Sequence, residues 1–395
     1  MDVLPHELTS ASDSPGVTYL DHAATTPLLP AVYDAVAAAL SGTFGNPANS
    51  SHCLGRDATS ALDCARLEVA ALIGADPADI CFTSGATEAN NLAIRGLASH
   101  ARGGPRHAIV VLEIEHRSVL APIDELAEAE GYEVRRAPVT ADGVIDLARF
   151  DQLLDDDVLL VAVHLANNEI GTIQPIAEIA ARARAHGAMV LCDATQAIGK
   201  VAIDVHDLGV DLLSLSAHKF HGPKGAGVLY LRPDVPIAPQ LTGGGQEHGL
   251  RAGTPNVPAI VGMGVAARLA RLHLEDGEVE LVRARRDRLE AALLELCPAS
   301  FVNGAGAPRL AGISSVTFRG CCGAELVKSM PELAISRGSA CSTSSPKPSH
   351  VLLALGHDDA DAFSTLRISM GVSTTDADID RAIETFERSL DAPAA

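Results

Sequence analysis

The stretch that decides the fold runs from Ser214 to Tyr230 and reads SLSAHKFHGPKGAGVLY. An apolar run at 211–215 leads into a turn that carries Lys219, and several glycines follow before the next apolar run at 227–231. A lysine at the end of a buried strand is fixed in place and partly desolvated. Desolvation lowers the pKa of the amine and frees a lone pair that can condense with an aldehyde. The stretch therefore predicts two buried strands joined by a turn that presents Lys219 as a reactive amine.

Strands and helices alternate upstream of Lys219. The expected strands cover 80–83, 108–112, 158–163 and 188–192, and the expected helices cover 30–40, 86–99, 118–130 and 176–186. This alternation is typical of βαβ units and predicts an α/β fold with a mostly parallel sheet covered by helices. Ligands bind such sheets outside the carboxyl ends of the strands. His116, Asn168, Asp193 and Lys219 each follow a strand end, so we expect them to meet in one site.

The pattern changes after the glycine-rich stretch 243–256. A long helical pattern dense in Arg and Glu covers 258–296, and two short strands (313–318 and 333–335) and a closing helix (376–390) follow it. We therefore expect two domains, a large one over 17–257 and a smaller α+β one over 258–395.

Composition argues against several classes of partner. The net charge is −20, aromatic residues make up 3% and Trp is absent, so direct binding to nucleic acid is not expected. The eight cysteines form no Cys-x-x-Cys pair, so we expect reduced thiols and no metal site. The longest apolar run, 158–166, is too short to span a bilayer, and residues 1–16 lack the basic and apolar regions of a signal peptide. A cytoplasmic protein without membrane contact is expected.

Two features upstream would complete a site around Lys219. Residues 84–87 follow a strand and open a helix, so the amides of Ala86 and Thr87 could hold a phosphate, although this motif alone is better explained as a helix cap. Asp193 could pair with a pyridinium nitrogen, with Gln196 near the ring hydroxyl, although alone Asp193 too would be a helix cap. The lysine, the carboxylate and the phosphate site together indicate a pyridoxal phosphate (PLP) enzyme.

Four more residues have a functional interpretation. His116 could stack on a pyridine ring and move protons, or cap a helix, and Asn168 could bind a ring oxygen or form a turn. Arg367 could hold a substrate carboxylate through its planar fork, or form a surface salt bridge. Cys341 lies in a loop of small residues with cationic side chains nearby, a setting that exposes the thiol and favours the thiolate. Cys341 is therefore the candidate nucleophile among the cysteines.

Together these motifs resemble a known family. The matching stretches are LDHAATTP (20–27), FGNPAN (44–49), FTSGATEANNLAI (82–94), EHRSV (115–119), ANNEIG (166–171), DATQ (193–196), SAHKFHGPKG (216–225), GGGQE (243–247), RAGT (251–254), GSACS (338–342) and LRISMG (366–371). They extend over nearly the whole length, from residue 18 to about 375. The chain resembles the cysteine desulfurases of the class V aminotransferase family, which are PLP-dependent enzymes of fold type I.

The resemblance implies a large domain built on a seven-stranded sheet, a segment over 17–30 that packs with the small domain, and a two-fold homodimer. It implies that Lys219 is the Schiff-base lysine and that Cys341 takes the sulfur of L-cysteine as a persulfide, leaving L-alanine. The other implied site residues are Ala86, Thr87, Ser216 and His218 at the phosphate, with Thr254 from the second subunit; Asp193, Gln196, His116 and Asn168 at the ring; and Arg367 with Asn168 at the substrate.

The resemblance leaves the sulfur acceptor open: it could be an iron–sulfur scaffold protein or an enzyme that thiolates tRNA, DNA or metabolites. Alternative activities are a selenocysteine lyase and a class V aminotransferase in which Cys341 is incidental. A catalytically silent docking platform for sulfur carriers is a third alternative. Because the Cys341 thiol must reach the substrate and then an outside acceptor, residues near 340–348 are expected to be among the most mobile.

Overall fold

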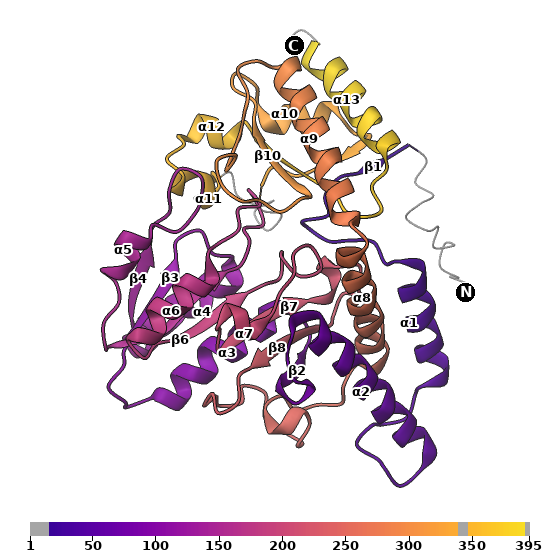
Figure 1. Ribbon diagram of the computed structural model, residues 1–395, viewed down its shortest axis with the longest axis vertical. Coiled ribbons are helices and arrows are strands. Elements are labelled where there is room, and N and C mark those ends of the chain that lie inside the picture. The colour runs from indigo at the N-terminus through magenta and orange to yellow at the C-terminus, as the bar shows by residue number, and fades with distance from the viewer. Residues whose placement is uncertain (1–15, 339–346, 392–395) are drawn as a thin grey trace, which may run out of the picture.

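The computed structural model describes residues 16–338 and 347–391 of the chain. Its centre is a seven-stranded sheet with the strand order β2-β8-β7-β6-β5-β3-β4 (Figure 1). The strands are β2 (Ile80–Thr83), β3 (Ala108–Leu112), β4 (Glu133–Ala137), β5 (Val158–His164), β6 (Met189–Asp193), β7 (Leu212–Ser216) and β8 (Gly227–Leu231). All neighbours pair in parallel except β8, which is antiparallel to both β2 and β7. The predicted mostly parallel, seven-stranded sheet is confirmed.

Both faces of this sheet are covered by helices, which explains why its inner strands are buried and mostly apolar. On β3, Ile109 and Val111 pack with α3 (Ala86–Ala101) and α4 (Arg117–Glu130), whereas Val110 and Leu112 face the other way. The opposite face is covered by α2 (Cys53–Ile73), α6 (Ile176–Ala185) and α8 (Val257–Glu275). The sheet is therefore the middle layer of three.

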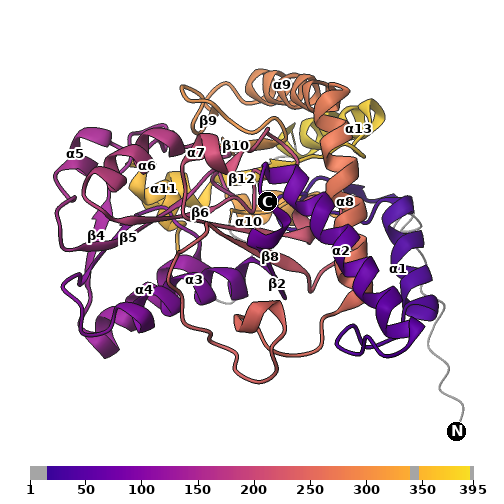
Figure 2. The ribbon, with the colours of Figure 1, turned by 60° about the horizontal axis from the view of Figure 1, so that its bottom comes forward.

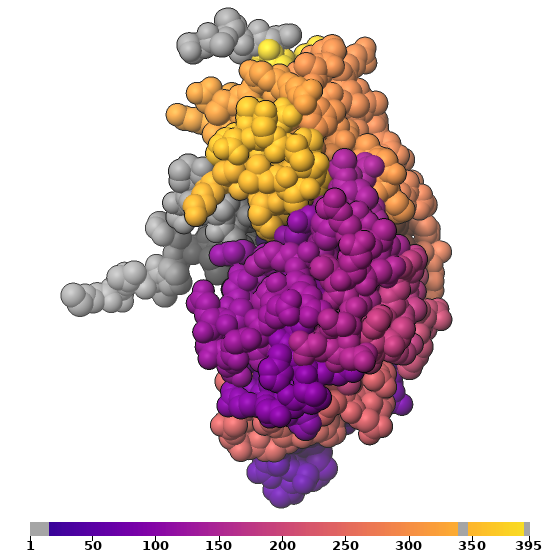
Figure 3. All heavy atoms as spheres, turned by 90° about the vertical axis from the view of Figure 1, so that its left-hand side faces the viewer, coloured from indigo at the N-terminus to yellow at the C-terminus, as the bar shows by residue number. Residues whose placement is uncertain are grey.

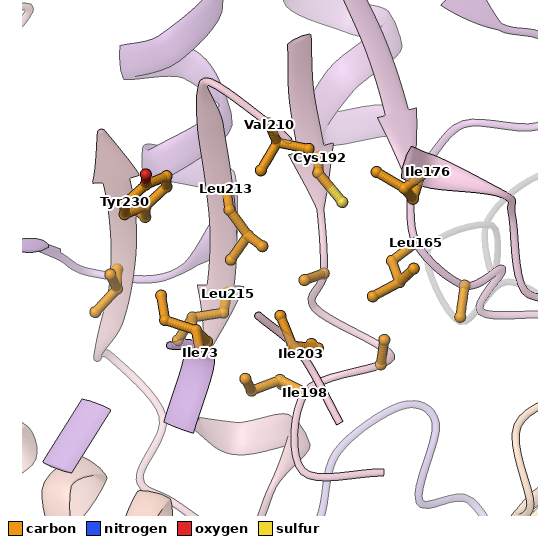
Figure 4. Packing of buried hydrophobic residues seen from close by; sticks show 14 of the residues in the cluster. Ile73, Leu165, Ile176, Cys192, Ile198, Ile203, Val210, Leu213, Leu215 and Tyr230 are labelled. Atoms are coloured by element: carbon orange, nitrogen blue, oxygen red, sulfur yellow. The ribbon is translucent and has the colours of Figure 1, made fainter. Parts of the chain in front are cut away.

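Figure 4 shows the packing on this second face. Leu213 and Leu215 of β7 and Cys192 of β6 project into one layer, where Ile73 of α2 and Ile176 of α6 also lie. Each of these side chains is at most 1% exposed. A rigid layer of this kind holds the strand ends in fixed positions, and the strand ends carry the candidate site.

The structure differs from the sequence patterns in several places, of which three concern a strand of the large sheet or long helices. The helix α2 and the strand β4 were not expected, and the single helical pattern over 258–296 is two helices, α8 and α9 (Glu278–Leu296). The break falls at Gly277, whose φ of +79° lies in the left-handed region that favours glycine. The sequence of β4 shows no apolar pattern because β4 is an edge strand, whose charged side chains are partly exposed.

A second core surrounds the three-stranded sheet β12-β10-β9, formed by β12 (Thr365–Ser369), β10 (Ile313–Thr317) and β9 (Phe301–Val302). Leu366 of β12, Leu289 of α9 and Phe386 of α13 (Asp376–Asp391) belong to it. Figure 2 shows α9 and α13 side by side, and Figure 3 shows the orange and yellow C-terminal segments capping the indigo-to-rose remainder.

The N-terminal segment joins this second core. β1 (Thr18–Tyr19) pairs in parallel with β11 (Leu333–Ala334), and the buried Leu20 belongs to the same hydrophobic cluster. The domain division expected at residue 257 stays a prediction. Since the buried side of α8 belongs to the core of the large sheet, the packing favours a boundary after α8, at 276–277.

The remaining α-helices of the described residues are α1 (Pro30–Gly42) and five shorter ones: α5 (Leu147–Asp151), α7 (Val205–Leu208), α10 (Gly323–Ser329), α11 (His350–Ala354) and α12 (Asp359–Phe363). Within the described ranges, α8 alone is long and apolar enough to cross a membrane by length and composition. Half of its apolar window is buried inside the protein, as in the core helix of a globular fold.

Candidate active site

The carboxyl ends of β5, β6 and β7 border a cavity of about 510 Å³. Ten of the residues predicted for the site line it: Ala86, Thr87, His116, Asn168, Asp193, Gln196, Ser216, His218, Lys219 and Arg367. They come from segments far apart in sequence, and the parallel strand ends bring them to one edge of the sheet. The structure thus gathers the predicted residues in a single site.

One end of the cavity is the N-terminus of α3. The interpretation of a Thr or Ser side chain as the helix cap is wrong, because Gly85 occupies the cap position and no described side chain forms a cap bond there. Of the capping box the described residues form only the Glu88 half, where Glu88 Oε2 accepts from the Ser84 amide (2.9 Å). Gly85 has a φ of +153°, and a Cβ on Gly227 would lie 2.5 Å from the Gly85 Cα. Two glycines are therefore needed for this close backbone approach. The first amides of α3 are left open to an anion in the cavity.

Lys219 lies in a single 3-10 turn directly after β7 (Ala217–Lys219). Its Nζ donates to the carbonyl oxygens of Ala23 (2.6 Å) and Ala24 (2.8 Å). The same N-terminal segment also donates to this turn, since Thr26 N and Thr26 Oγ1 both donate to the His218 carbonyl. The segment 20–27 thus positions the lysine, a role that its sequence alone did not indicate.

A chain of hydrogen bonds connects Asp193 with His116. Asn90 Nδ2 donates to Asp193 Oδ2 (2.9 Å) and to Ser118 Oγ (3.0 Å), and Ser118 Oγ lies 2.8 Å from His116 Nδ1. The amide of Thr195 donates to Asp193 Oδ1 (2.9 Å). These donors fix the Asp193 carboxylate at the cavity edge. Asn90 was missed from the sequence because a buried Asn inside a helix carries no motif of its own.

His116 caps a helix and also lines the cavity, so its helix-cap interpretation is confirmed, while its stacking on a ring and its proton transfer stay predictions. Its Nδ1 accepts from the amide of Ser118 (3.1 Å) as the cap of α4, and its ring also lines the cavity. Burial lowers the pKa of His116, and the nearby Asp193 carboxylate partly opposes this. Since Nδ1 accepts, the proton of the neutral ring is on Nε2. Burial, reinforced by Lys219, also lowers the pKa of His218 to about 4, so His218 is neutral near pH 7.

Arg367 is 2% exposed and already has an anionic partner. Its Nη2 donates to Asp21 Oδ1 (2.8 Å) and its Nη1 to the carbonyl of Asn168 (3.0 Å). Its Nε has no hydrogen-bond partner among the described residues. The surface salt bridge considered for Arg367 is therefore wrong, because the guanidinium is buried in the cavity wall with a donor left over.

Two predicted residues remain. Cys341 lies outside the described residues, so its role and the expected mobility around 340–348 stay predictions. Thr254 is exposed and lines a neighbouring cavity of about 190 Å³, which also contacts Ser84 and Gly225. The contribution of Thr254 to the site of a second subunit remains a prediction.

The cavity fits PLP, the cofactor that the resemblance implies. It offers an uncapped helix N-terminus for a phosphate, the Asp193 carboxylate for a ring nitrogen, and the Lys219 amine in the same wall. Three buried atoms of the lining lack partners within the described part of the chain: His164 Nε2, Thr195 Oγ1 and Arg367 Nε. Buried polar atoms are nearly always satisfied, so a bound group is expected to supply their partners.

Comparisons with known proteins agree with this geometry. The family model for Aminotransferase class-V matches residues 18–382. A cysteine desulfurase IscS of Klebsiella pneumoniae subsp. pneumoniae is 44% identical over 379 residues, which cover 94% of this chain and 92% of that protein.

Solved structures show the same fold. A NifS-like protein is 34% identical with a TM-score of 0.87, covering 94% of this chain and 98% of its own. SspA in complex with cysteine is 35% identical with a TM-score of 0.79, covering 91% of this chain and all of its own. The chain therefore belongs to the aminotransferase class-V family and, within it, to the PLP-dependent cysteine desulfurases.

Proposed function

We propose that the protein takes sulfur from L-cysteine, leaves L-alanine, and carries the sulfur as a persulfide on Cys341. The observation that supports this most directly is the convergence of Lys219, Asp193, His116 and Arg367 on one cavity. The chain that forms this cavity is 44% identical to a cysteine desulfurase over nearly its whole length. A solved relative at 35% identity is described in complex with cysteine.

The cavity residues divide into a phosphate group and a ring group. The open amides of α3, with Thr87, Ser216 and His218, would hold the cofactor phosphate. Asp193 would hold the ring nitrogen, with Gln196 and Asn168 near the ring oxygen and His116 against the ring face. When bound, PLP supplies an electron-withdrawing ring that makes a proton on the amino acid's α-carbon easier to remove.

The residues around the ring would position L-cysteine and move protons. Arg367 would bind the substrate carboxylate with the donors that Asp21 and Asn168 leave unused. The Lys219 amine would take the proton from the α-carbon, and His116 would hold a proton at Nε2. The Cys341 thiolate would attack the substrate sulfur, so that an S–S bond forms while the C–S bond breaks and its electron pair goes to carbon. A proton on that carbon completes L-alanine.

The acceptor and the assembly are further parts of the proposal. A partner protein's thiol would accept the sulfur of the persulfide, as in iron–sulfur cluster assembly or thiolation, in a cytoplasmic setting.

Large apolar side chains of α1 and the following loop are exposed, namely Tyr33 (63%), Leu40 (65%) and Phe44 (69%). Such a patch would be covered in a two-fold homodimer that also brings Thr254 to the neighbouring site.

The test is a product assay of the purified, PLP-loaded protein. With L-cysteine and a thiol reductant, L-alanine and sulfide should form in equal amounts without any keto acid. Turnover that requires a keto acid and yields no sulfide would replace this proposal with an aminotransferase. A strong preference for L-selenocysteine over L-cysteine would replace it with a selenocysteine lyase.

A further inference from the structure

His164 is a buried histidine in the wall of the cofactor cavity that none of the steps above uses. It is the last residue of β5, pairs in register with Asp193 of the neighbouring strand β6, and is 5% exposed. Paired residues of parallel strands project to the same face of a sheet, so the His164 ring lies on the side of the sheet to which Asp193 points. Both residues line the cavity.

Glu115 holds the His164 ring in one orientation. Its side chain is fully buried, and Oε1 accepts from His164 Nδ1 (2.8 Å) and from the His164 backbone amide. Because a carboxylate only accepts, Nδ1 is assigned as the protonated nitrogen. The backbone of Glu115 is also held in place, because His350 Nε2 of α11 donates to the Glu115 backbone carbonyl oxygen (3.0 Å).

The other ring nitrogen, Nε2, is then the open hydrogen-bonding group of this pair. It has no partner among the residues that the structure describes, although the atom is buried. Leaving a buried polar atom unsatisfied costs about 1–3 kcal/mol, so such an atom normally has a partner. His164 forms part of the lining of the cavity, so a group bound there can supply the partner of Nε2.

We propose that His164 is a further cofactor-contacting residue, whose Nε2 bonds to the ligand beside Asp193 while Glu115 fixes the ring. This inference rests on the proposed function, because it takes the occupant of the cavity to be the PLP-bound substrate complex or PLP itself. It adds a contact from β5 to those from α3, β6 and β7. Without it, Nε2 would have no hydrogen-bond partner among the described residues when a ligand fills the cavity and excludes water.

The test compares variants of the PLP-loaded enzyme by cofactor affinity, measured by diluting the holoenzyme and following the bound fraction by absorbance. His164→Met keeps the bulk of the side chain and removes both ring nitrogens. The apparent dissociation constant of PLP should rise about five- to tenfold, as expected for the loss of one hydrogen bond. His357→Met, which removes a histidine that contacts the Phe301 ring and lies outside the cavity lining, should leave the constant unchanged.

A double variant separates this role from a purely structural one. If His164 serves only to satisfy the buried Glu115 carboxylate, Glu115→Gln combined with His164→Met should restore the wild-type affinity for PLP, and the inference is wrong. If Nε2 contacts the ligand, the double variant should bind PLP as weakly as His164→Met alone.

Nitrogen NMR of the wild-type enzyme gives a readout that needs no folded single variant. The His164 Nε2 resonance, assigned by its absence in the double variant, should shift when the holoenzyme binds L-cysteine or is depleted of PLP. An Nε2 resonance that is insensitive to both would overturn the contact. A wild-type protein that binds no PLP would instead sink the proposed function, so the two failures are distinguishable.

Discussion

Lys219 and Lys200 are two lysines whose amines both lie near the cofactor cavity. Lys200 Nζ donates to the carbonyl oxygen of Gln196 (2.9 Å) and to its Oε1 (3.3 Å), so it orients a residue of the cavity wall. Burial, with a contribution from the charge of Lys219, lowers the pKa of Lys200 from 10.5 to about 7. A lysine with a pKa of about 7 has a large neutral, nucleophilic fraction near pH 7, so Lys200 is the natural competitor of Lys219 for an aldehyde.

Borohydride reduction of the holoenzyme distinguishes the two amines. We expect the reduced cofactor on Lys219, because this residue lines the large cavity itself, whereas Lys200 lines only the narrow space behind it. Lys219→Ala should abolish the covalent label and the yellow colour, while the circular dichroism spectrum is retained. A label found on Lys200 or Lys224 would show that the lysine is assigned wrongly.

The depressed pKa of Lys200 predicts how stability depends on pH. Between about pH 7 and 10.5 the unfolded chain holds a proton on Lys200 that the folded protein has lost, so the free energy of unfolding increases with pH. The slope is at most about 1.4 kcal/mol per pH unit. Lys200→Met removes this dependence on pH. The melting temperature of the variant should therefore exceed that of the wild type most near pH 7, and the difference should shrink toward pH 10. A constant difference over that range would mean that Lys200 is not buried as described.

At the scale of elements, the phosphate end of the site depends on how β8 approaches the start of α3. A Cβ on Gly227 would lie 2.5 Å from Gly85 Cα and 2.7 Å from the Leu215 carbonyl oxygen, and backbone atoms cannot rotate away. The start of α3 would have to move, and with it the amides that face the cavity. The element that holds the cofactor phosphate is therefore positioned by a strand that is distant in sequence.

Gly227→Ala should weaken PLP binding about tenfold, because overpacking of this kind costs about 1–3 kcal/mol. The measurement is again the dilution of the holoenzyme followed by absorbance. Gly42→Ala is the matched control, since a Cβ on Gly42 would meet nothing within 4 Å. Equal affinities of the two variants would show that the close approach of β8 has no part in forming the phosphate site.

Much of this architecture follows from local patterns in the sequence. The buried strands β2, β3 and β5 show as apolar runs, and the residues after strand ends, such as Asp193 and Lys219, indicate where ligands bind. The features that the sequence does not predict depend on tertiary contacts. An edge strand such as β4 needs no apolar pattern, and Gly85 stands at the start of α3 in place of a side-chain cap because β8 approaches it closely.

The same limit applies to the partners of the site residues. The contact between Arg367 and Asp21 joins positions 346 residues apart, and that between Asn90 and Asp193 joins positions 103 apart. Resemblance to a family points to Arg367 and Asp193 themselves. Only the folded chain shows that Asp21 competes for the arginine and that Asn90 holds the carboxylate.

The whole molecule presents an apolar patch on one side, where Tyr33 and Leu40 lie seven residues apart on α1 and Phe44 follows. Seven residues are about two helical turns, so both side chains face the same way. A neighbouring subunit would cover this patch. The wild type should therefore behave as a dimer in light scattering, and Leu40→Glu combined with Phe44→Glu should halve the measured mass and weaken PLP binding.

The control is Leu281→Glu, which places the same charge on an exposed leucine of α9 (51% exposed) and should leave the dimer intact. A wild-type protein that is monomeric, PLP-loaded and active would contradict both the dimer and the role of Thr254 in a neighbouring site.

The central claim is that sulfur leaves L-cysteine for one particular thiol of this protein. Mass spectrometry of peptides from the holoenzyme, taken after a brief exposure to L-cysteine without reductant, tests it most directly. The account predicts one added sulfur atom on the peptide that carries Cys341, none on those of the other seven cysteines, and loss of the added sulfur in Lys219→Ala. Persulfide on a different cysteine, or an unmodified Cys341 in protein that has produced L-alanine, would contradict it.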